Sequence, residues 1–217
     1  MVRKPTVPAQ IHVLAGVNGA GKSSIVGATI RDKGGEYYNP DEAAREIMAA
    51  NPGVGQTEAN AAAWDQGRKL LQRAIEQGLD FTFETTLGGN TMPGLLGEAA
   101  KRGIEVHVFY VGLGSAEAHI ERVRQRVRAG GHDIPETAIR RRFRHSLINL
   151  VKLLPVLTAL RVYDNSAPAD PASGQAPTPA LVLHMERGRI VGPSDLTSTP
   201  AWAKPVVAAA LELTQGP

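Results

Sequence analysis

One stretch of the sequence combines the residue types that bind a phosphate chain. Directly behind the apolar run QIHVLA stands GVNGAGKSS, which begins at Gly16 and ends at Ser24. Glycines allow consecutive backbone N–H groups to curl around phosphate oxygens, where a β-carbon would obstruct them. A lysine reaches the outer phosphates, and the adjacent hydroxyl is suited to bind Mg²⁺. The pattern predicts a nucleoside triphosphate site built from Gly16, Val17, Asn18, Gly19, Ala20, Gly21, Lys22, Ser23 and Ser24, with Ser23 as the metal ligand.

The rest of the chain narrows the kind of phosphate-loop protein. Switch GTPases need an Asn-Lys-x-Asp guanine reader, which the sequence lacks. Motor ATPases carry an apolar strand that ends in a metal-binding carboxylate, whereas the strand VHVFYVG has no acid at its end. The phosphate loop alone does not name a reaction. What remains is typical of a small ATP-dependent kinase with an arginine-rich lid.

A carboxylate follows the second predicted strand. The segment EYYN, residues 36–39, reads as a short strand, and Asp41 comes two residues after it in the first turn of a predicted helix. The carboxyl ends of parallel strands lie beside the nucleotide crevice. Asp41 is suited there to accept a proton from an attacking hydroxyl, or to hold Mg²⁺ through water. The alternative is that Asp41 and Glu42 only balance the helix dipole.

A second polar group stands at the end of the predicted strand LDFTFETT. Glu84, Thr85 and Thr86 fall at its carboxyl end, just before two glycines. Their acceptors and hydroxyls suit a polar substrate with several hydroxyl groups. The alternative is a turn-capping acid beside ordinary strand threonines.

Arginines concentrate in two predicted helices that form a lid over residues 115–151. Eight of the 24 cationic residues lie between Arg122 and Arg144, and the pair Gly130-Gly131 separates the two helices. Such a joint suits a lid that closes over nucleotide. Phosphoryl transfer requires positive charge at the moving oxygens, which arginine supplies through a planar fork. We expect two or three of the eight to contact phosphate. The positions expected to be buried are Ile120, Val123 and Val127 in the first helix and Ile139, Phe143 and Leu147 in the second.

Strand-like and helix-like segments alternate along the whole chain. This alternation predicts an α/β fold with a parallel sheet and helices on both faces, followed by a small C-terminal hairpin and helix. A helix is expected from Thr57 to Gln77, with Trp64, Leu71 and Ile75 on its buried side. No linker divides the sequence, so we expect one kinase domain over residues 1–217.

Composition limits the setting of the protein. The 217 residues are 42% hydrophobic and 21% charged, with a net charge of +3 and no cysteine. Disulfides, thiolate metal sites and cysteine nucleophiles are therefore excluded. The apolar runs are too short to cross a bilayer, and the first ten residues have no apolar signal core. We expect a cytoplasmic protein with no membrane partner.

Taken together, these motifs resemble the zeta toxin family of P-loop kinases. The resemblance rests on GVNGAGKSS, YYNPDEAAREI, FTFETTLGG, RVRAGGHDIPETAIRRRFRHSL and VYDNS, in the family's order. It implies a five-stranded parallel core, ATP and Mg²⁺ at Lys22 and Ser23, and Asp41 as the base. It also implies that Glu84, with Thr85 or Thr86, binds the acceptor.

The resemblance further implies that one arginine from each lid helix bridges the phosphates. We select Arg126 and Arg142, with Arg128 and Arg141 as the alternatives. Asp164 or Asn165 would lie near the adenine.

The better-known toxins phosphorylate the 3′-hydroxyl of the sugar in UDP-N-acetylglucosamine, and they pair with protein antitoxins. They are longer than this chain, and their extra segments shape the sugar-nucleotide site and the antitoxin contacts. The expected acceptor is therefore a small hydroxylated metabolite, with UDP-N-acetylglucosamine as one candidate.

Two rival functions remain. A kinase for nucleic-acid ends would use the arginines to follow the backbone, but it would also need stacking aromatics. Aromatics make up only 5% of the chain, and Phe143 is the single one in the lid helices. A non-catalytic ATP-binding regulator is the second rival, which loss of Asp41 or of the lid arginines would favour. Both are present.

Overall fold

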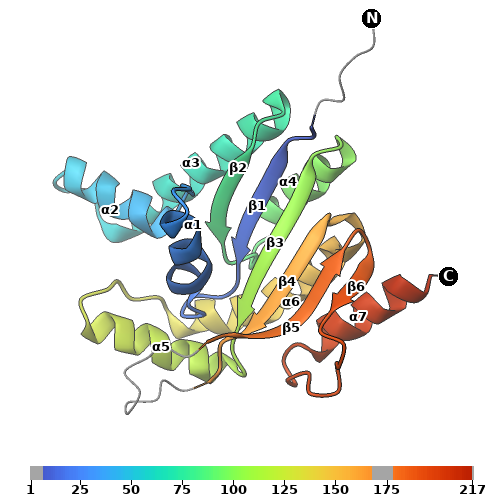
Figure 1. The fold of residues 1–217 in the computed structure, drawn as a ribbon. Coiled ribbons are helices and arrows are strands. Elements are labelled where there is room, and N and C mark those ends of the chain that lie inside the picture. The colour runs from blue at the N-terminus through green and yellow to red at the C-terminus, as the bar shows by residue number, and fades with distance from the viewer. Residues whose placement is uncertain (1–6, 168–177, 217) are drawn as a thin grey trace, which may run out of the picture.

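The computed structural model describes residues 7–167 and 178–216 (Figure 1). Strands and helices alternate as predicted. In chain order they are β1 (Gln10–Ala15), a π-helical turn (Ser23–Gly27), α1 (Ala28–Asp32), α2 (Pro40–Ala50), α3 (Gln56–Gln77), β2 (Phe81–Thr85), α4 (Thr91–Lys101), β3 (Glu105–Gly112), α5 (Ala116–Arg128), α6 (Glu136–Leu153), a 3₁₀ turn (Leu154–Val156), β4 (Ala159–Asp164), β5 (Ala180–Glu186), β6 (Arg189–Gly192) and α7 (Lys204–Gln215). Among the described residues, no helix is both long and apolar enough to cross a membrane.

The six strands form one sheet in the order β2-β1-β3-β4-β5-β6. The first four are parallel, and β5 and β6 form the predicted C-terminal hairpin, which joins antiparallel to β4. The parallel core therefore has four strands, and the expectation of five is wrong. Residues 36–39 make only an isolated bridge, Tyr38 to Phe83. The chain leaves the sheet there because the Asn39 side chain caps α2 and Pro40 begins it.

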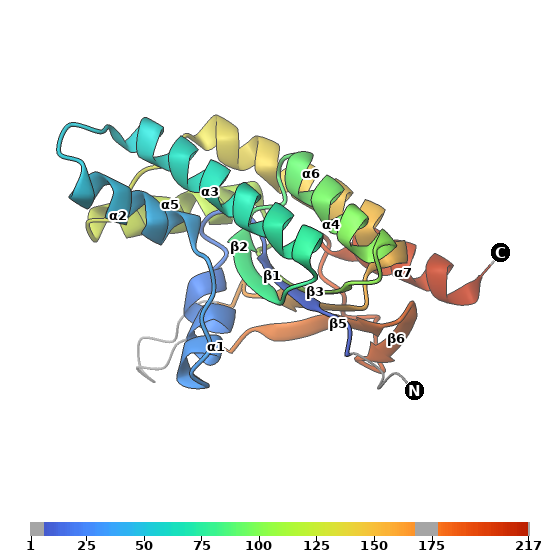
Figure 2. The ribbon, with the colours of Figure 1, turned by 90° about the horizontal axis from the view of Figure 1, so that it is seen from above.

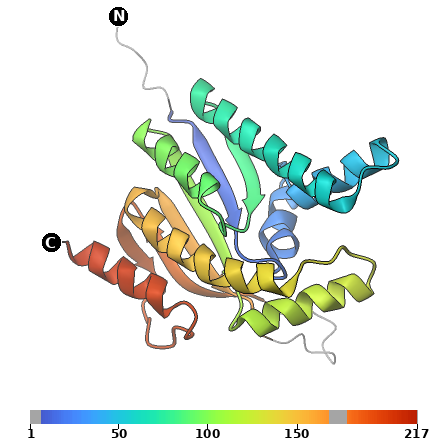
Figure 3. The ribbon, with the colours of Figure 1, turned by 180° about the vertical axis from the view of Figure 1, so that it is seen from behind.

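Helices cover the two faces of the sheet unequally. Figures 2 and 3 show α3, α4 and α6 lying along one face, whereas α1 lies on the opposite side near the carboxyl end of β1. The main core fills the space under the first group. Its fully buried members include Ile11 and Val108 from the strands, Leu71 from α3, Leu96 from α4 and Leu150 from α6. The predicted α/β arrangement is confirmed, with most of the helical cover on one side.

Helix α3 departs from the expectation in one position that bears on function. Leu71 and Ile75 are buried as predicted, and Gly78 ends the helix in the left-handed conformation. Trp64, however, is 45% exposed, so the prediction that it is buried is wrong. The first half of α3 packs on α2 through small residues, chiefly Ala59 and Ala63, and not on the sheet. The indole is thereby left on a free side of the helix.

The lid helices bury their predicted apolar positions incompletely. Ile120 and Val123 of α5 pack with Ile139 of α6 and with Val17 of the phosphate loop. Val127, by contrast, is 36% exposed, which contradicts its predicted burial. It lies in the last turn of α5, beyond the part of the helix that packs against α6 and the loop. The two helices therefore pack on the phosphate loop through Ile120, Val123 and Ile139, whereas Val127 stays outside that apolar contact.

Candidate active site

The phosphate loop connects β1 to the π-helical turn that starts at Ser23. Gly16 has φ +136°, and a Cβ there would lie 2.1 Å from the backbone oxygen of Val111 on the neighbouring strand β3. Gly21 has φ +94°, and a Cβ there would lie 2.6 Å from Nδ2 of Asn165. Two of the glycines are thus required by close packing and by backbone conformation. The bare backbone leaves the N–H groups available for phosphate.

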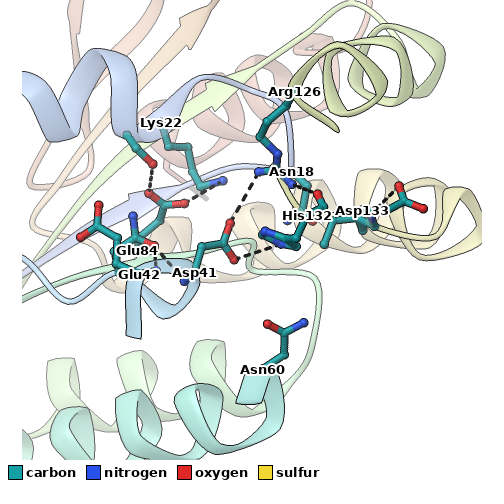
Figure 4. A network of polar contacts seen from close by, with 12 residues as sticks. Asn18, Lys22, Asp41, Glu42, Asn60, Glu84, Arg126, His132 and Asp133 are labelled. Atoms are coloured by element: carbon teal, nitrogen blue, oxygen red, sulfur yellow. Dashed lines mark hydrogen bonds and ion pairs between the residues drawn. The ribbon is translucent and has the colours of Figure 1, made fainter. Parts of the chain in front are cut away.

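Lys22 and Ser23 share one carboxylate in this structure. The Nζ of Lys22 is 3.3 Å from Oε1 of Glu84, and the Ser23 hydroxyl donates to Oε2 at 2.7 Å. Figure 4 shows Lys22 and Glu84 side by side. The parallel register explains the contact, because it pairs Leu14 of β1 with Glu84 of β2 and so places the end of β2 beside the loop. Glu84 therefore lies against the phosphate loop, as expected if its strand neighbours β1, and its direct partners there are Lys22 and Ser23.

The oxygen atoms of Ser23 and Glu84 fit Mg²⁺. A hydroxyl and a carboxylate 2.7 Å apart are hard ligands of the kind that this ion prefers. Within residues 7–167 and 178–216, no group of three or more acidic, histidine or cysteine side chains gathers to hold a metal alone. Such a group is not needed for Mg²⁺, which commonly takes one or two protein ligands and completes its coordination shell with substrate phosphates and water.

Asn165 supports the phosphate loop from the end of β4. Its Nδ2 donates to the backbone oxygen of Ala20 at 2.9 Å, and its own backbone oxygen accepts from Arg122 at 2.5 Å. Burial lowers the pKa of Arg122 from its ordinary value. The neighbouring Asp164 accepts from Ser166 and from the Trp202 indole. The structure thus places Asn165 at the loop backbone, and it adds Arg122, which the sequence did not single out.

Asp41 lies at the amino end of α2 and faces the lid. Its backbone N–H is capped by Oδ1 of Asn39 at 2.9 Å. One carboxylate oxygen is 3.6 Å from Nη1 of Arg126 on α5, and the other is 3.7 Å from Nε2 of His132 in the joint between α5 and α6 (Figure 4). Three distant segments of the chain therefore meet at the candidate base.

The two selected arginines both point into the site. Arg142 donates from Nη1 to Oδ1 of Asn18 in the phosphate loop at 2.7 Å. A Cβ at Gly88 would lie 2.7 Å from its Cγ, so the arginine stem packs directly on that glycine. Burial, with Arg141 nearby, lowers the pKa of Arg142. Of the two alternatives, Arg141 lines the cavity described next, whereas Arg128 is exposed and pairs with Glu121.

A cavity of about 390 Å³ opens between the phosphate loop, the lid and α3. Thr85 and Thr86 form part of its wall, and each hydroxyl accepts a backbone N–H from the turn that follows β2. Trp64, which was predicted to be buried, forms another part of the wall. The polar and charged side chains that line it are Asn18, Asp41, Asn60, Glu84, Thr85, Thr86, Thr91, His132, Arg141 and Arg142. The sequence-predicted acceptor residues and the candidate base thus share one space.

His119 on α5 is a loop-supporting residue that the sequence reasoning missed. Its side chain is buried, and Nδ1 lies 2.9 Å from the backbone oxygen of Asn18, which can only accept. Burial lowers the pKa of His119 to about 4. The residues around His119 do not indicate that it contacts the phosphate loop, because its partner Asn18 lies 101 residues away in the sequence.

We expect the free energy of unfolding to decrease as the pH falls from 6.5 to 4. The His119 pKa is depressed in the folded state, so the unfolded chain takes up a proton there that the folded chain does not. The stability that depends on a neutral His119 is fully present above pH 6.5 and is lost as the pH falls to 4. It amounts to about 3 kcal/mol for a pKa shift of this size. Denaturant melts at several pH values check it. His119→Asn keeps a donor near Nδ1 but does not titrate in this range, so the free energy of unfolding should depend less on pH. An equally steep decrease in that variant would show that His119 is not the titrating group.

Comparison with known proteins agrees with this geometry. A family model described as Zeta toxin matches residues 3–169. An uncharacterized protein of Haemophilus influenzae is 32% identical over 148 residues, which is 66% of this chain and 100% of that protein.

Two solved structures share the fold. The crystal structure of AvrRxo1-ORF1 with ORF2 and ATP superposes with a TM-score of 0.65 at 12% identity, over 94% of this chain and 64% of that one. The chain therefore spans just under two thirds of the AvrRxo1 chain. The PezAT chromosomal toxin–antitoxin system of Streptococcus pneumoniae gives a TM-score of 0.52 at 14% identity, over 75% and 69% of the two chains.

Proposed function

The chain belongs to the zeta toxin family of P-loop kinases, and from that premise we propose that it transfers the γ-phosphoryl group of ATP to a sugar hydroxyl of a nucleotide-linked sugar. One observation carries the proposal. The cavity that contains Asp41, Glu84 and Thr86 opens directly onto Asn18 of the phosphate loop. A donor phosphate and an acceptor hydroxyl can therefore meet beside a carboxylate.

The phosphate loop binds the triphosphate in the proposed mechanism. Its backbone N–H groups surround the phosphates, and Lys22 leaves Glu84 to contact the outer phosphate oxygens. Ser23 and Glu84 would hold Mg²⁺, whose positive charge would offset the negative charge that develops during transfer. Lys22 and the oxygen pair are thus already gathered before nucleotide arrives.

Asp41 acts on the acceptor in the proposed mechanism. One of its carboxylate oxygens takes the proton of the acceptor hydroxyl as the oxygen of that hydroxyl forms its bond to the γ-phosphorus. The bond from the γ-phosphorus to the bridging oxygen breaks, and ADP leaves with the electron pair. Asp41 then returns its proton to solvent.

Arg126 and Arg142 stabilise the transferred group in the proposed mechanism. Arg142 already lies on Asn18 of the loop, and Arg126 pairs with Asp41 in this structure. When nucleotide binds, the more strongly charged phosphates would attract Arg126 away from the carboxylate. That exchange would free Asp41 for the acceptor and bring the second lid cation to the phosphates.

We expect Arg126→Ala and Arg142→Ala each to lower turnover by about a hundredfold or more, as loss of a transition-state cation does. Lysine at either position should restore little, because it lacks the planar fork. Steady-state assays of kcat measure the effect. Arg124→Ala is the matched control, since Arg124 lies on α5 but pairs with exposed Glu136. Near-normal rates in both test variants would place these side chains outside the reaction.

The walls of the cavity support an acceptor that carries both a ring and an anion. Trp64 presents an indole that is 45% exposed, which suits contact with a sugar or base ring. The Arg141 side chain lines the same space, and within the described residues its guanidinium has no protein hydrogen-bond or ion-pair partner. A free guanidinium beside the acceptor suits a phosphate group. A UDP-linked sugar combines these features, and UDP-N-acetylglucosamine is the first compound to test.

Incubation with ATP, Mg²⁺ and UDP-N-acetylglucosamine, read by mass spectrometry and phosphorus NMR, tests the proposal. We expect a phosphate monoester on the sugar. Turnover on RNA 5′- or 3′-ends, with none on the sugar nucleotide, would identify the protein as a kinase for nucleic-acid ends. ATP binding without transfer to any hydroxyl compound would indicate a non-catalytic regulator. The toxin–antitoxin name of the Streptococcus pneumoniae relative also supports a protein inhibitor as partner. Growth arrest by the wild-type chain, absent with Asp41→Asn, would support that part.

A further inference from the structure

His132 is the residue of the site that neither the motifs nor the comparisons assign a role. It lies in the joint between the lid helices, and its side chain is only 16% exposed. Its Nε2 points at Oδ1 of Asp41 across 3.7 Å (Figure 4). That nitrogen is buried and has no hydrogen-bond partner in the structure's described residues.

A buried donor without a partner is costly, because it has lost its water without gaining a protein acceptor. Oδ1 of Asp41 lies 3.7 Å from Nε2, which exceeds the usual length of an N–H···O hydrogen bond by less than about 1 Å. Arg126 contacts the backbone of His132, Asp133 follows it in the chain, and the other charged side chains that share its cavity are Asp41, Glu84, Arg141 and Arg142. A small movement of the joint toward α2 would complete the bond.

The joint is mechanically tied to Arg126. Nη2 of Arg126 donates to the backbone oxygen of His132 at 3.1 Å, while Nη1 faces the second oxygen of Asp41. A Cβ at Gly131 would lie 2.7 Å from Cγ of Arg126, so the joint packs directly on the arginine stem. The backbone of the joint and the stem of Arg126 therefore belong to one packed unit, and a movement of the lid shifts both.

We propose that His132 is the positioning residue of the base, an inference that rests on the proposed kinase function. As the lid closes on nucleotide, Nε2–H donates to Oδ1 of Asp41. Arg126 moves from Oδ2 to the phosphates in the same motion. Asp41 is then held by one oxygen and presents the other to the acceptor hydroxyl, so closure of the lid and orientation of the base occur together.

The test compares three substitutions that place a donor differently. Glutamine reaches the position of Nε2 with an amide N–H, asparagine reaches only the position of Nδ1, and alanine reaches neither. We expect His132→Gln to keep kcat within about fivefold, and His132→Asn and His132→Ala to lower kcat by about thirtyfold or more, within the range that orienting groups contribute. The acceptor KM should change by less than about threefold in all three.

His145→Gln is the matched control, because His145 lies exposed on α6 and away from the cavity. ATP affinity by calorimetry should stay within a few-fold of the wild type, and the melting temperature should not fall in any variant, which separates positioning from folding. Equal decreases of kcat in the glutamine and alanine variants, or an unchanged kcat in the alanine variant, would overturn the role of Nε2. The proposed kinase function would still stand if the wild type turns over. Absence of wild-type transfer to any acceptor would instead count against the proposed function.

Discussion

Lys22→Ala should abolish phosphoryl transfer, with kcat/KM for ATP lowered by about a thousandfold or more. Lys22 is the cation of the phosphate loop, it is 5% exposed, and its amine lies 3.3 Å from Glu84 and 3.4 Å from the backbone oxygen of Val17. Without it, no side-chain cation of the loop reaches the outer phosphates. Calorimetry with ATP and Mg²⁺ should show a matching loss of affinity.

The same substitution should destabilise the folded chain, and the structure provides a way to separate the two effects. Removing the lysine leaves the Glu84 carboxylate buried without its cation, which typically costs about 3–5 kcal/mol. Lys22→Ala combined with Glu84→Gln removes both charges and should recover most of the melting temperature. Turnover should stay lost in the double variant. Equal ATP affinity and activity in the wild type and Lys22→Ala would defeat the nucleotide assignment.

Asp41→Asn should lower kcat by about a thousandfold, while ATP affinity stays within a few-fold of the wild type. A base acts on the acceptor's proton and not on the triphosphate, so its loss appears in the chemical step. The amide is isosteric, and the backbone cap from Asn39 does not depend on the side chain that is changed. Rapid-quench measurement of transfer, beside calorimetry with ATP, resolves the two quantities.

Glu42→Gln is the control for this experiment. Glu42 adjoins Asp41 in the same helical turn, yet its carboxylate pairs with Arg31 at 2.6 Å in a solvent-exposed contact. Surface pairs of this kind contribute little to stability, so the control should keep normal turnover and melting. A collapse of ATP affinity in Asp41→Asn would make Asp41 a structural or metal-holding residue and remove it from the role of base.

Much of the fold was predictable from the chain because its signals are local. The alternation of apolar strands and amphipathic helices, with Gly78 ending α3 and Pro40 opening α2, predicts the order of the elements. The exceptions arose where packing overrides pattern. Residues 36–39 have strand-like composition but pair with β2 only at Tyr38, and Trp64 has helical spacing but lies off the face on which Ala59 and Ala63 pack against α2.

The phosphate loop can be identified without the structure, because its glycines, Lys22 and Ser23 stand at a set spacing within nine consecutive residues. Which distant groups complete the site depends instead on how the elements pack. Glu84 meets Ser23 across 61 residues, and Arg142 meets Asn18 across 124, contacts that depend on strand order and lid packing. Asp41 meets His132 and Arg126 only because α2 and the lid joint converge. No local sequence pattern predicts such pairings, because each contact joins side chains on two elements that are far apart in the sequence and meet only when the elements pack.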